Sequence, residues 1–228
     1  MNAEGSGDTA PARPWRTWIF NPFHFVAGGK ALAAGLAVIT VAGAVNSRTG
    51  SHFDGVLDFH TGAILPWWTY WVEGPINWLV LSALLLPAGW ALSKSRVRPI
   101  DVFGTQALAR FPTVVMALSM WPPFVQRANQ RMVTALLQLQ QPGTVQSSQE
   151  MWAALHSTLA PMDMVISLAV VLIVLAMLVW MLILMYRAFA VSCNVSGGKA
   201  VGAFIVLLVA AEILSKIVLG FVYYLGSP

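Results

Sequence analysis

Charged residues are scarce in this sequence. Asp, Glu, Lys and Arg together make up 10% of its 228 residues, whereas soluble domains carry about 25%. Hydrophobic residues make up 57%, and the mean hydropathy is +0.70. So few charges cannot cover a water-soluble surface, and we therefore expect lipid to surround much of the chain. Cysteine is scarce too: Cys193 is the only one, which excludes an intrachain disulfide.

The short motifs of common catalytic sites are also missing. The sequence has no Gly-x-Ser-x-Gly elbow, no His-Glu-x-x-His helix and no Cys-x-x-Cys pair. The stretch SGGK at residues 196–199 lacks the upstream glycine spacing and the following Ser or Thr of a phosphate-binding loop. We therefore expect a protein that is not an enzyme and needs no cofactor.

Five apolar segments could cross a hydrocarbon core of about 30 Å, which takes roughly 20 helical residues. The sequence therefore predicts an all-α, polytopic integral membrane bundle of five transmembrane helices. Their expected positions are about residues 30–46, 74–93, 102–125, 164–187 and 199–225. The third span is the weakest, because Arg110 lies inside it and prolines interrupt it. Residues 1–20 are expected to be a disordered cytoplasmic tail, and residues 21–228 the membrane domain.

The distribution of Lys and Arg predicts the orientation of these spans. With the N-terminus inside, eight of these residues lie near the inner ends of the spans. Three lie in the outer loops, namely Arg48, Arg127 and Arg131. We therefore expect a multi-pass protein of a bacterial cytoplasmic membrane, with its N-terminus cytoplasmic and its C-terminus outside. This bias also accounts for the net charge of +4, so no nucleic acid partner is expected.

The longest segment between spans, residues 126–162, is expected to lie outside the membrane. Its stretch VQRANQRMVTALLQLQQ has apolar residues near helical spacing, which predicts a helix on the membrane surface or an extension of the third span. Ser147 and Glu150 form a capping-box pattern, which predicts a second short helix after them.

The stretch SHFDGVLDFH, residues 51–60, gathers ionisable side chains in the predicted outer loop between the first two spans. Four of these side chains are of types that bind zinc and similar divalent ions: His52, Asp54, Asp58 and His60. A turn at Gly55 would bring them together, because alternate residues of an extended chain face the same side. The spacing matches no established zinc or calcium pattern, so a solvated loop at the end of the hydrocarbon is the favoured interpretation and a metal site the alternative.

Charges inside the predicted spans form a second candidate site, an intramembrane polar cluster of Arg110, Glu212 and Lys216. Counted from the inner end at ~1.5 Å per residue, Arg110 lies about 12 Å deep and Glu212 about 20 Å deep. Glu212 and Lys216 are four residues apart, the spacing of an ion pair on one helix face. Because charges in the membrane are costly, we expect an ionic clasp between spans three and five. The alternative is a proton or ion relay, in a small transporter or channel subunit.

Small residues in the first and fifth spans predict close packing of helices. They are Ala31, Ala34, Gly35 and Ala42 in the first span, and Gly202, Ala203, Ala210 and Ala211 in the fifth. Pro87 and Pro112 are expected to kink the second and third spans.

Four segments, taken in order, resemble the bacterial branch of the Yip family (Ypt/Rab-interacting proteins) of polytopic membrane proteins. These segments are NPFHF, VEGPINW, VFGTQALARFP and YRAFAVSCNVSGGKAVGAFIVLL. The matching positions are Asn21 and Pro22 before the first span, Glu73, Gly74 and Pro75 at the second, Gly104 and Pro112 at the third, and Gly197, Gly198 and Lys199 before the fifth. The likeness covers most of the chain from about residue 20.

The resemblance implies a five-helix membrane domain that acts as a scaffold, adaptor or membrane-organising protein. Its expected partners are the lipid bilayer and either other membrane proteins or further copies of itself. The chain lacks the long cytosolic N-terminal domain of the eukaryotic members, so a Rab-type GTPase is not expected as a partner. A third interpretation is an outward-facing membrane protein that binds a divalent metal through the His and Asp residues of the stretch 51–60.

Overall fold

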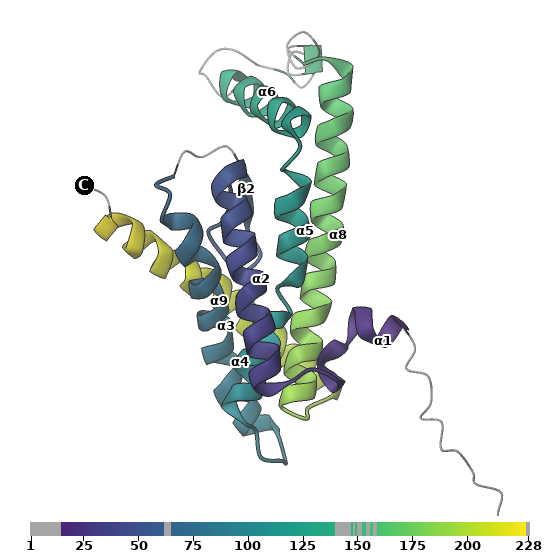
Figure 1. Ribbon diagram of the computed structural model, residues 1–228, viewed down its shortest axis with the longest axis vertical. Helices are drawn as coiled ribbons and strands as arrows, with labels where there is room; N and C mark the ends of the chain where they lie inside the picture. Colours follow the sequence, from purple (N-terminus) through teal and green to yellow (C-terminus); the bar gives the residue numbers. More distant parts are fainter. Residues whose placement is uncertain are drawn as a thin grey trace, which may run out of the picture.

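A computed structural model describes residues 15–61, 65–139 and 159–226, together with residues 147, 149, 152, 153 and 156. The molecule is mostly helical (Figure 1). Its elements are, in chain order, α1 (Trp15–Phe20), η1 (Pro22–His24), α2 (Gly28–Thr49), β1 (Ser51–Phe53), β2 (Phe59–Thr61), α3 (Thr69–Leu92), α4 (Pro99–Leu108), α5 (Phe111–Ser119), α6 (Pro123–Leu139), α8 (Pro161–Ser192) and α9 (Gly197–Gly226).

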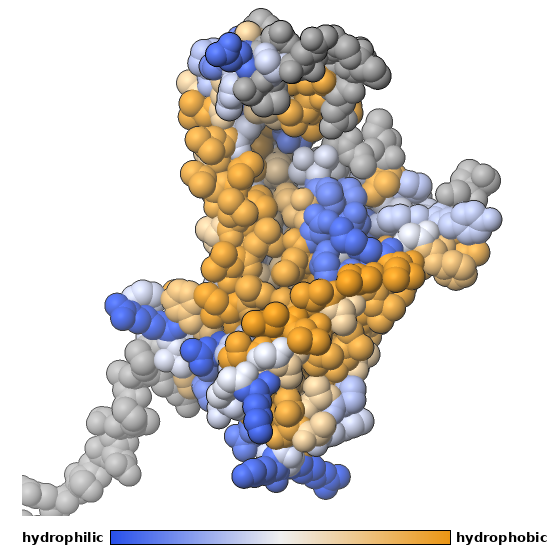
Figure 2. Space-filling view, turned by 180° about the vertical axis from the view of Figure 1, so that it is seen from behind, coloured by the Kyte–Doolittle hydropathy of each residue, from blue (hydrophilic) through white to orange (hydrophobic). Residues whose placement is uncertain are grey.

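Four helices are long and apolar enough to cross a membrane: α2, α3, α8 and α9, with 22, 24, 32 and 30 residues. They overlap four of the five predicted spans and extend beyond each of them at one or both ends. In α8 the outward-facing side chains of Val165, Leu168 and Leu172 are 58–62% exposed. Figure 2, which views the molecule from behind relative to Figure 1, shows apolar residues over much of that side. These observations agree with a membrane protein.

The third predicted span differs from the expectation, because residues 102–125 do not form one long helix. The chain is helical in α4, breaks at Ala109 and Arg110, and is helical again in α5. Pro112 lacks a backbone N–H and therefore cannot continue the hydrogen-bond ladder of α4. Residues 120–122, which include Pro122, then separate α5 from α6, and α6 begins at Pro123. Neither α4 nor α5 is long enough to be a candidate span by itself.

Close helix contacts position this broken segment. Both α4 and α5 pack against α2. A Cβ atom added at Gly35 of α2 would lie 2.5 Å from the backbone carbonyl carbon of Ala107, and one added at Gly104 would lie 2.5 Å from the carbonyl oxygen of Gly28. Real Cβ atoms do not approach so closely, so only glycine fits at these two contacts. The prediction that Gly35 serves close packing is confirmed.

The start of the membrane domain also differs from the expectation. Residues 15–20, predicted to be part of a disordered tail, form α1 beside α8. The indole Nε1 of Trp180 in α8 donates a hydrogen bond to the carbonyl oxygen of Ile19 at 3.0 Å. Trp15, Trp18 and Phe20 are exposed, as expected for aromatic residues at a membrane surface. Residues 1–14 lie outside the described part of the chain.

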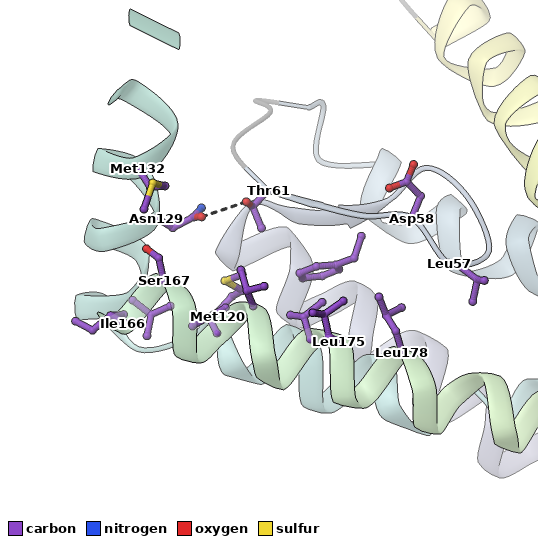
Figure 3. A pocket seen from close by; sticks show the side chains of 15 residues that line it. Leu57, Asp58, Thr61, Met120, Asn129, Met132, Ile166, Ser167, Leu175 and Leu178 are labelled. Carbon is purple, nitrogen blue, oxygen red and sulfur yellow. Dashed lines mark hydrogen bonds between the residues drawn. The ribbon is translucent and has the colours of Figure 1, made fainter. Parts of the chain in front are cut away.

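Residues 123–139 form the amphipathic helix α6, which begins at the end of the predicted third span and continues into the predicted outer segment. Helix α6 packs against the first part of α8 (Figure 1). The second short helix predicted after Ser147 falls mainly on residues outside the described part. A groove of about 340 Å³ lies between α6, α8 and residues 57–61. Figure 3 shows its lining.

Candidate functional site

A β-hairpin inserted among the helices forms the centre of the candidate site. Strands β1 and β2 pair antiparallel, with His52 opposite His60. Two carboxyl groups on different helices hold this hairpin. The backbone N–H of Phe53 donates to Oε2 of Glu73 in α3 at 2.8 Å, and that of Leu57 donates to Oε2 of Glu212 in α9 at 2.8 Å. The hairpin is therefore fixed by residues that lie 20 and 155 positions further along the chain.

Glu73 is the more deeply buried of the two carboxyl groups. Its side chain is 2% exposed and it accepts a second hydrogen bond, from the hydroxyl of Tyr223, at 2.5 Å. The Nδ1 atom of His52 lies 3.3 Å from its Oε1 atom. From the next turn of α3, the amide of Asn77 donates to the carbonyl oxygen of Phe53 at 3.0 Å. Polar groups inside an apolar bundle are tolerated when they satisfy one another in this way.

The hairpin reaches the middle of α9, one of the four candidate spans. Glu212 lies midway along α9, and a Cβ atom at Gly55 would collide with its carboxyl group. Non-helical backbone at membrane depth is tolerated only where protein buries it or where it lines a water-filled cavity. Here Phe53 and Val56 are buried, at 5% and 0% exposure, whereas the charged side chains of the hairpin are not. The hairpin therefore has an anchored apolar side and a partly exposed polar side.

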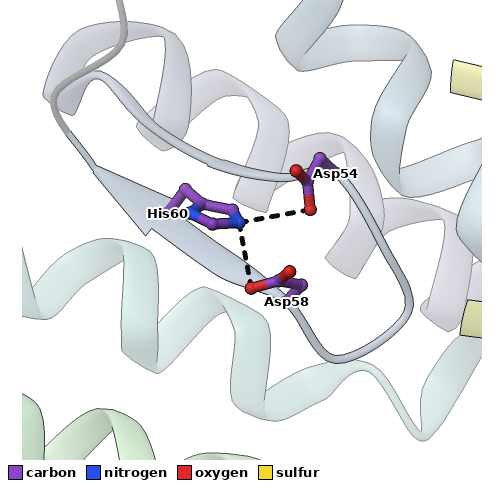
Figure 4. A group of neighbouring side chains, drawn as sticks. All are labelled: Asp54, Asp58 and His60. Atoms are coloured by element: carbon purple, nitrogen blue, oxygen red, sulfur yellow. Dashed lines mark ion pairs between the residues drawn. The ribbon is translucent and has the colours of Figure 1, made fainter. Parts of the chain in front are cut away.

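The polar side carries the acidic–histidine cluster, which we define as Asp54, Asp58 and His60 (Figure 4). The Nε2 atom of His60 lies 2.9 Å from Oδ1 of Asp58 and 3.3 Å from Oδ1 of Asp54. Lys216 of α9 contacts Asp58 directly and lies 3.4 Å from Asp54. Burial would raise the pKa of Asp58, but hydrogen bonds from Lys216 and His60 outweigh it and lower that pKa below its ordinary value.

The cluster has the chemistry of a cation site. One ligand atom from each of its three residues lies within 4.8 Å of the others, and two carboxylates with an imidazole suit zinc or a similar divalent ion. The ammonium of Lys216 already pairs with the same carboxylates, so a metal ion would have to compete with it. Three of the four predicted ligands come together. The fourth, His52, stacks on the His60 ring at a centroid distance of 5.5 Å but turns its Nδ1 atom to Glu73.

The predicted intramembrane cluster is formed only in part. The Nζ atom of Lys216 lies 3.8 Å from Oε1 of Glu212, as their spacing in the sequence predicts. In the described part of the chain no ion pair joins Arg110 to Glu212, although Glu212 lies near enough for its charge to act on the guanidinium. Helix α9 packs mainly against α3, whereas α5 packs mainly against α2 and α8. Arg110 is 2% exposed, and its Nε and Nη2 atoms have no hydrogen-bond partner in the described part of the chain.

A small cavity lies at Arg110 and is also lined by Glu73, Asn77 and Thr113. Its volume is about 20 Å³, which is enough for one water molecule. The amide oxygen of Asn77 also has no hydrogen-bond partner in the described part of the chain. One water bridging this oxygen and the guanidinium would satisfy a donor and an acceptor together.

Several positions of the family-like motifs have structural roles. Glu73 holds the hairpin, and a Cβ at Gly74 would lie 2.8 Å from the Cγ2 atom of Ile39. Pro112 ends the ladder of α4, and Gly197 begins α9 with a φ of +80°, a conformation that favours glycine. Asn21 and Pro22 precede and begin η1, Pro75 lies within α3, and Gly198 and Lys199 lie in the first turn of α9.

Sequence reasoning did not assign roles to Asn77 and Tyr223 in the site. Each is a polar side chain within a predicted apolar span, and that mismatch is the signal that could have singled them out.

Comparison of this chain with protein-family models, with characterised proteins and with solved structures finds no match. What can be said of its function therefore comes from the arrangement of its own residues. That arrangement can fix a polar hairpin within an apolar bundle, and it leaves a cluster of two carboxylates, an imidazole and an ammonium partly exposed.

Proposed function

We propose that this chain is a non-enzymatic integral membrane scaffold of Yip type, which acts through contacts with lipid and with other membrane proteins. The main observation in support of the proposal is that two carboxyl groups hold the hairpin. Glu73 and Glu212 each accept a backbone N–H of the hairpin. Both carboxyl groups thus hold the hairpin in place, which favours a structural use of these intramembrane charges over a proton or ion relay.

We further propose that α4 and α5 together form a discontinuous fifth span. Together with residues 109 and 110 between them, they cover residues 99–119, which at ~1.5 Å per residue is about 30 Å, enough to cross the hydrocarbon. The break is buried against α2 and α8, so its free backbone groups are shielded from lipid. The N-terminus is then cytoplasmic and the C-terminus outside, in agreement with the bias of Lys and Arg.

Labelling from either side of sealed vesicles tests this orientation. Single cysteines at Ala10 and Pro228 should react with an impermeant maleimide from opposite sides, with Ala10 protected in right-side-out vesicles. The native Cys193 is buried and should give little background. Reaction of both engineered positions from the same side would overturn the five-span arrangement.

The scaffold is tested against transport by reconstitution in vesicles loaded with a pH-sensitive dye. Wild type, Glu212→Gln and Arg110→Gln are expected to give the same proton and potassium flux as protein-free vesicles. Glu212→Gln should instead lower the unfolding temperature, because it removes the negative charge beside Lys216. Lys199→Gln, at an exposed position of α9, is the matched control and should leave that temperature unchanged. Flux in wild type that Glu212→Gln abolishes would replace the scaffold with a transporter.

A positive test uses a photo-reactive amino acid at Ile213, which is 56% exposed on α9. In the native membrane a scaffold should give a discrete cross-linked protein band from this position, and mass spectrometry would then identify the partner or a second copy. Lipid adducts alone, with no protein band from Ile213 or from Val206 on the same helix, would contradict a scaffold that works through α9.

The acidic–histidine cluster favours a second candidate, an outward-facing protein that binds a divalent metal. Its three ligand atoms within 4.8 Å of one another are the specific observation. The test is calorimetric titration with Zn²⁺ at pH 7, on wild type and on His60→Ala. Near-stoichiometric binding that His60→Ala abolishes would favour this candidate. Equal, weak heats in both proteins would exclude it and leave Lys216 as the resident cation of the cluster.

A further inference from the structure

The groove between α6, α8 and residues 57–61 lies beside the site described above and shares the hairpin residues Leu57 and Asp58 with it (Figure 3). Its volume of about 340 Å³ is within the range of about 300–1,000 Å³ that small-ligand pockets cover. One face of α8, from Ile166 to Leu178, forms the longest wall. Leu57 and Phe59 of the hairpin also line the groove. The lining is therefore mainly hydrocarbon, along about 18 Å of helix.

The mouth of the groove is continuous with the apolar outer surface of α8. Val171 and Leu175 line the groove, and yet their side chains are 52% and 53% exposed. Leu168 and Leu172, on the adjoining face, are 61% and 58% exposed. In a membrane this surface is covered by lipid chains, so the groove opens sideways into lipid. An unfilled apolar groove would leave its lining atoms without contacts on one side.

One end of the groove is polar and carries no net charge. Thr61 donates a hydrogen bond to the amide oxygen of Asn129 at 3.2 Å, and Ser167 lies beside them (Figure 3). The hydroxyl oxygen of Ser167 is buried and has no hydrogen-bond partner in the described part of the chain. A buried hydroxyl without a partner is costly, so this end is suited to an acceptor such as an ester carbonyl. Leu178 marks the other, apolar end.

We infer that the groove binds one acyl chain of a bilayer phospholipid, with its ester carbonyl at Ser167 and its chain along α8 toward Leu178. The inference rests on the proposed function and deepens it. A scaffold that acts through contacts with lipid would have, in this groove, a defined binding site for one lipid molecule. It accounts for the continuity of the groove with the lipid-facing surface, for its apolar length and for the unpaired hydroxyl at one end. Asp58 also lines the groove, but its carboxyl group faces away from α8 (Figure 3).

The experiment uses the full chain in vesicles doped with a phosphatidylcholine that carries a diazirine in its acyl chain. After illumination, peptide mass spectrometry locates the lipid adducts. Adducts are expected on groove residues of α8, on Met120 or Met132, and on Leu57 or Phe59. Random contact with lipid cannot label the hairpin in this way, because Leu57 and Phe59 face the groove. The same measurement on Ser167→Val is expected to lower hairpin labelling by removing the hydrogen bond to the ester.

Two variants distinguish the groove from the general lipid surface. Val171→Trp places a large side chain in the mouth, at a position exposed enough to leave packing intact. It should lower labelling of Leu57 and Phe59 several-fold. Ile173→Trp, on the same helix but outside the lining, is 42% exposed in the wild type and should leave hairpin labelling unchanged. Leu175→Trp is the second filling variant if Val171→Trp fails to fold.

The outcomes distinguish failure of the lipid site from failure of the proposed function. Labelling of the hairpin that falls in Val171→Trp or Leu175→Trp, and not in Ile173→Trp, supports the lipid site. Labelling of outer α8 residues such as Leu172 without the hairpin overturns the lipid site but leaves the membrane scaffold standing. Absence of lipid adducts from both surfaces would overturn the membrane placement of α8 and with it the proposed function.

Discussion

The hydroxyl of Tyr223 donates a hydrogen bond to the carboxyl group of Glu73 at 2.5 Å, and so joins the end of α9 to the first turns of α3. The two residues are 150 positions apart in the chain. Glu73 also receives the N–H of Phe53. One carboxyl group therefore connects the hairpin with both of the helices that enclose it.

Removal of this contact should destabilise the protein. Tyr223→Phe deletes the donor and leaves the ring in place, so it is expected to lower the free energy of unfolding by about 1–2 kcal/mol. Denaturant unfolding in detergent micelles measures the change. Tyr224→Phe is the matched control, because Tyr224 is 78% exposed and should be replaceable without effect. Equal stability of Tyr223→Phe and wild type would show that the hydrogen bond does not contribute.

The contact between α2 and α4 should not tolerate a larger residue. Gly35→Ala places a methyl group against the backbone of Ala107, and overpacking of this kind costs about 1–3 kcal/mol. Gly202→Ala provides the control, because a Cβ atom at Gly202 meets no atom within 4 Å. This control should be neutral or slightly stabilising, since alanine favours a helix over glycine. Thermal unfolding of both variants would test the difference, and a neutral Gly35→Ala would contradict the close contact.

The stability of the hairpin should fall at low pH. The pKa of Asp58 is lowered in the folded protein. Ionised Asp58 therefore contributes stability at any pH above its ordinary pKa of about 4. This contribution is lost as the pH falls through the lowered pKa. The unfolding temperature of wild type should therefore decrease between pH 6 and pH 3 more than that of Asp58→Asn. Parallel pH profiles of the two proteins would argue against the interaction. The effect should be modest, because the Asp58 side chain is 36% exposed and solvent screens its charge.

Cys193 should be an unreactive thiol. Burial raises its pKa to about 12, so at pH 8 about one molecule in ten thousand carries the reactive thiolate, against roughly a quarter for an ordinary thiol. A maleimide should therefore modify the native protein very slowly and the denatured protein at once. Ser95→Cys, at an exposed position, is the comparison and should gain one rapid adduct. Rapid modification of native wild type would show that the segment around Cys193 opens.

The spanning helices could be predicted because composition alone determines them. The apolar run of α8 leaves no other structure available in lipid, and its polar flanks set its limits to within a few residues. The third span could not be predicted as the structure has it. Its hydropathy suggested a single helix, but the missing N–H of Pro112 and the close contact of Gly104 with α2 divide it into α4 and α5.

The sequence predicts which residues belong to the candidate site better than it predicts which of them contact one another. The stretch 51–60 was identified as a cluster, and three of its four expected ligands lie together. The roles of His52 and Arg110 were not predictable, because distance along a helix gives depth but not which helices are neighbours. Arg110 lies on a segment that packs mainly against α2 and α8, whereas Glu212 lies on α9, which packs mainly against α3. Their charges therefore act on each other without forming an ion pair.

The hairpin has a consequence for biosynthesis. Its strands leave the ribosome early, yet Glu212 and Tyr223 belong to the last described helix. Until α9 has been made and inserted, the polar backbone of residues 53 and 57 has only water or the translocation machinery to satisfy it. The hairpin is therefore fixed last, and in the proposed orientation a chain arrested before α9 should display residues 51–61 to an external protease that the finished protein resists.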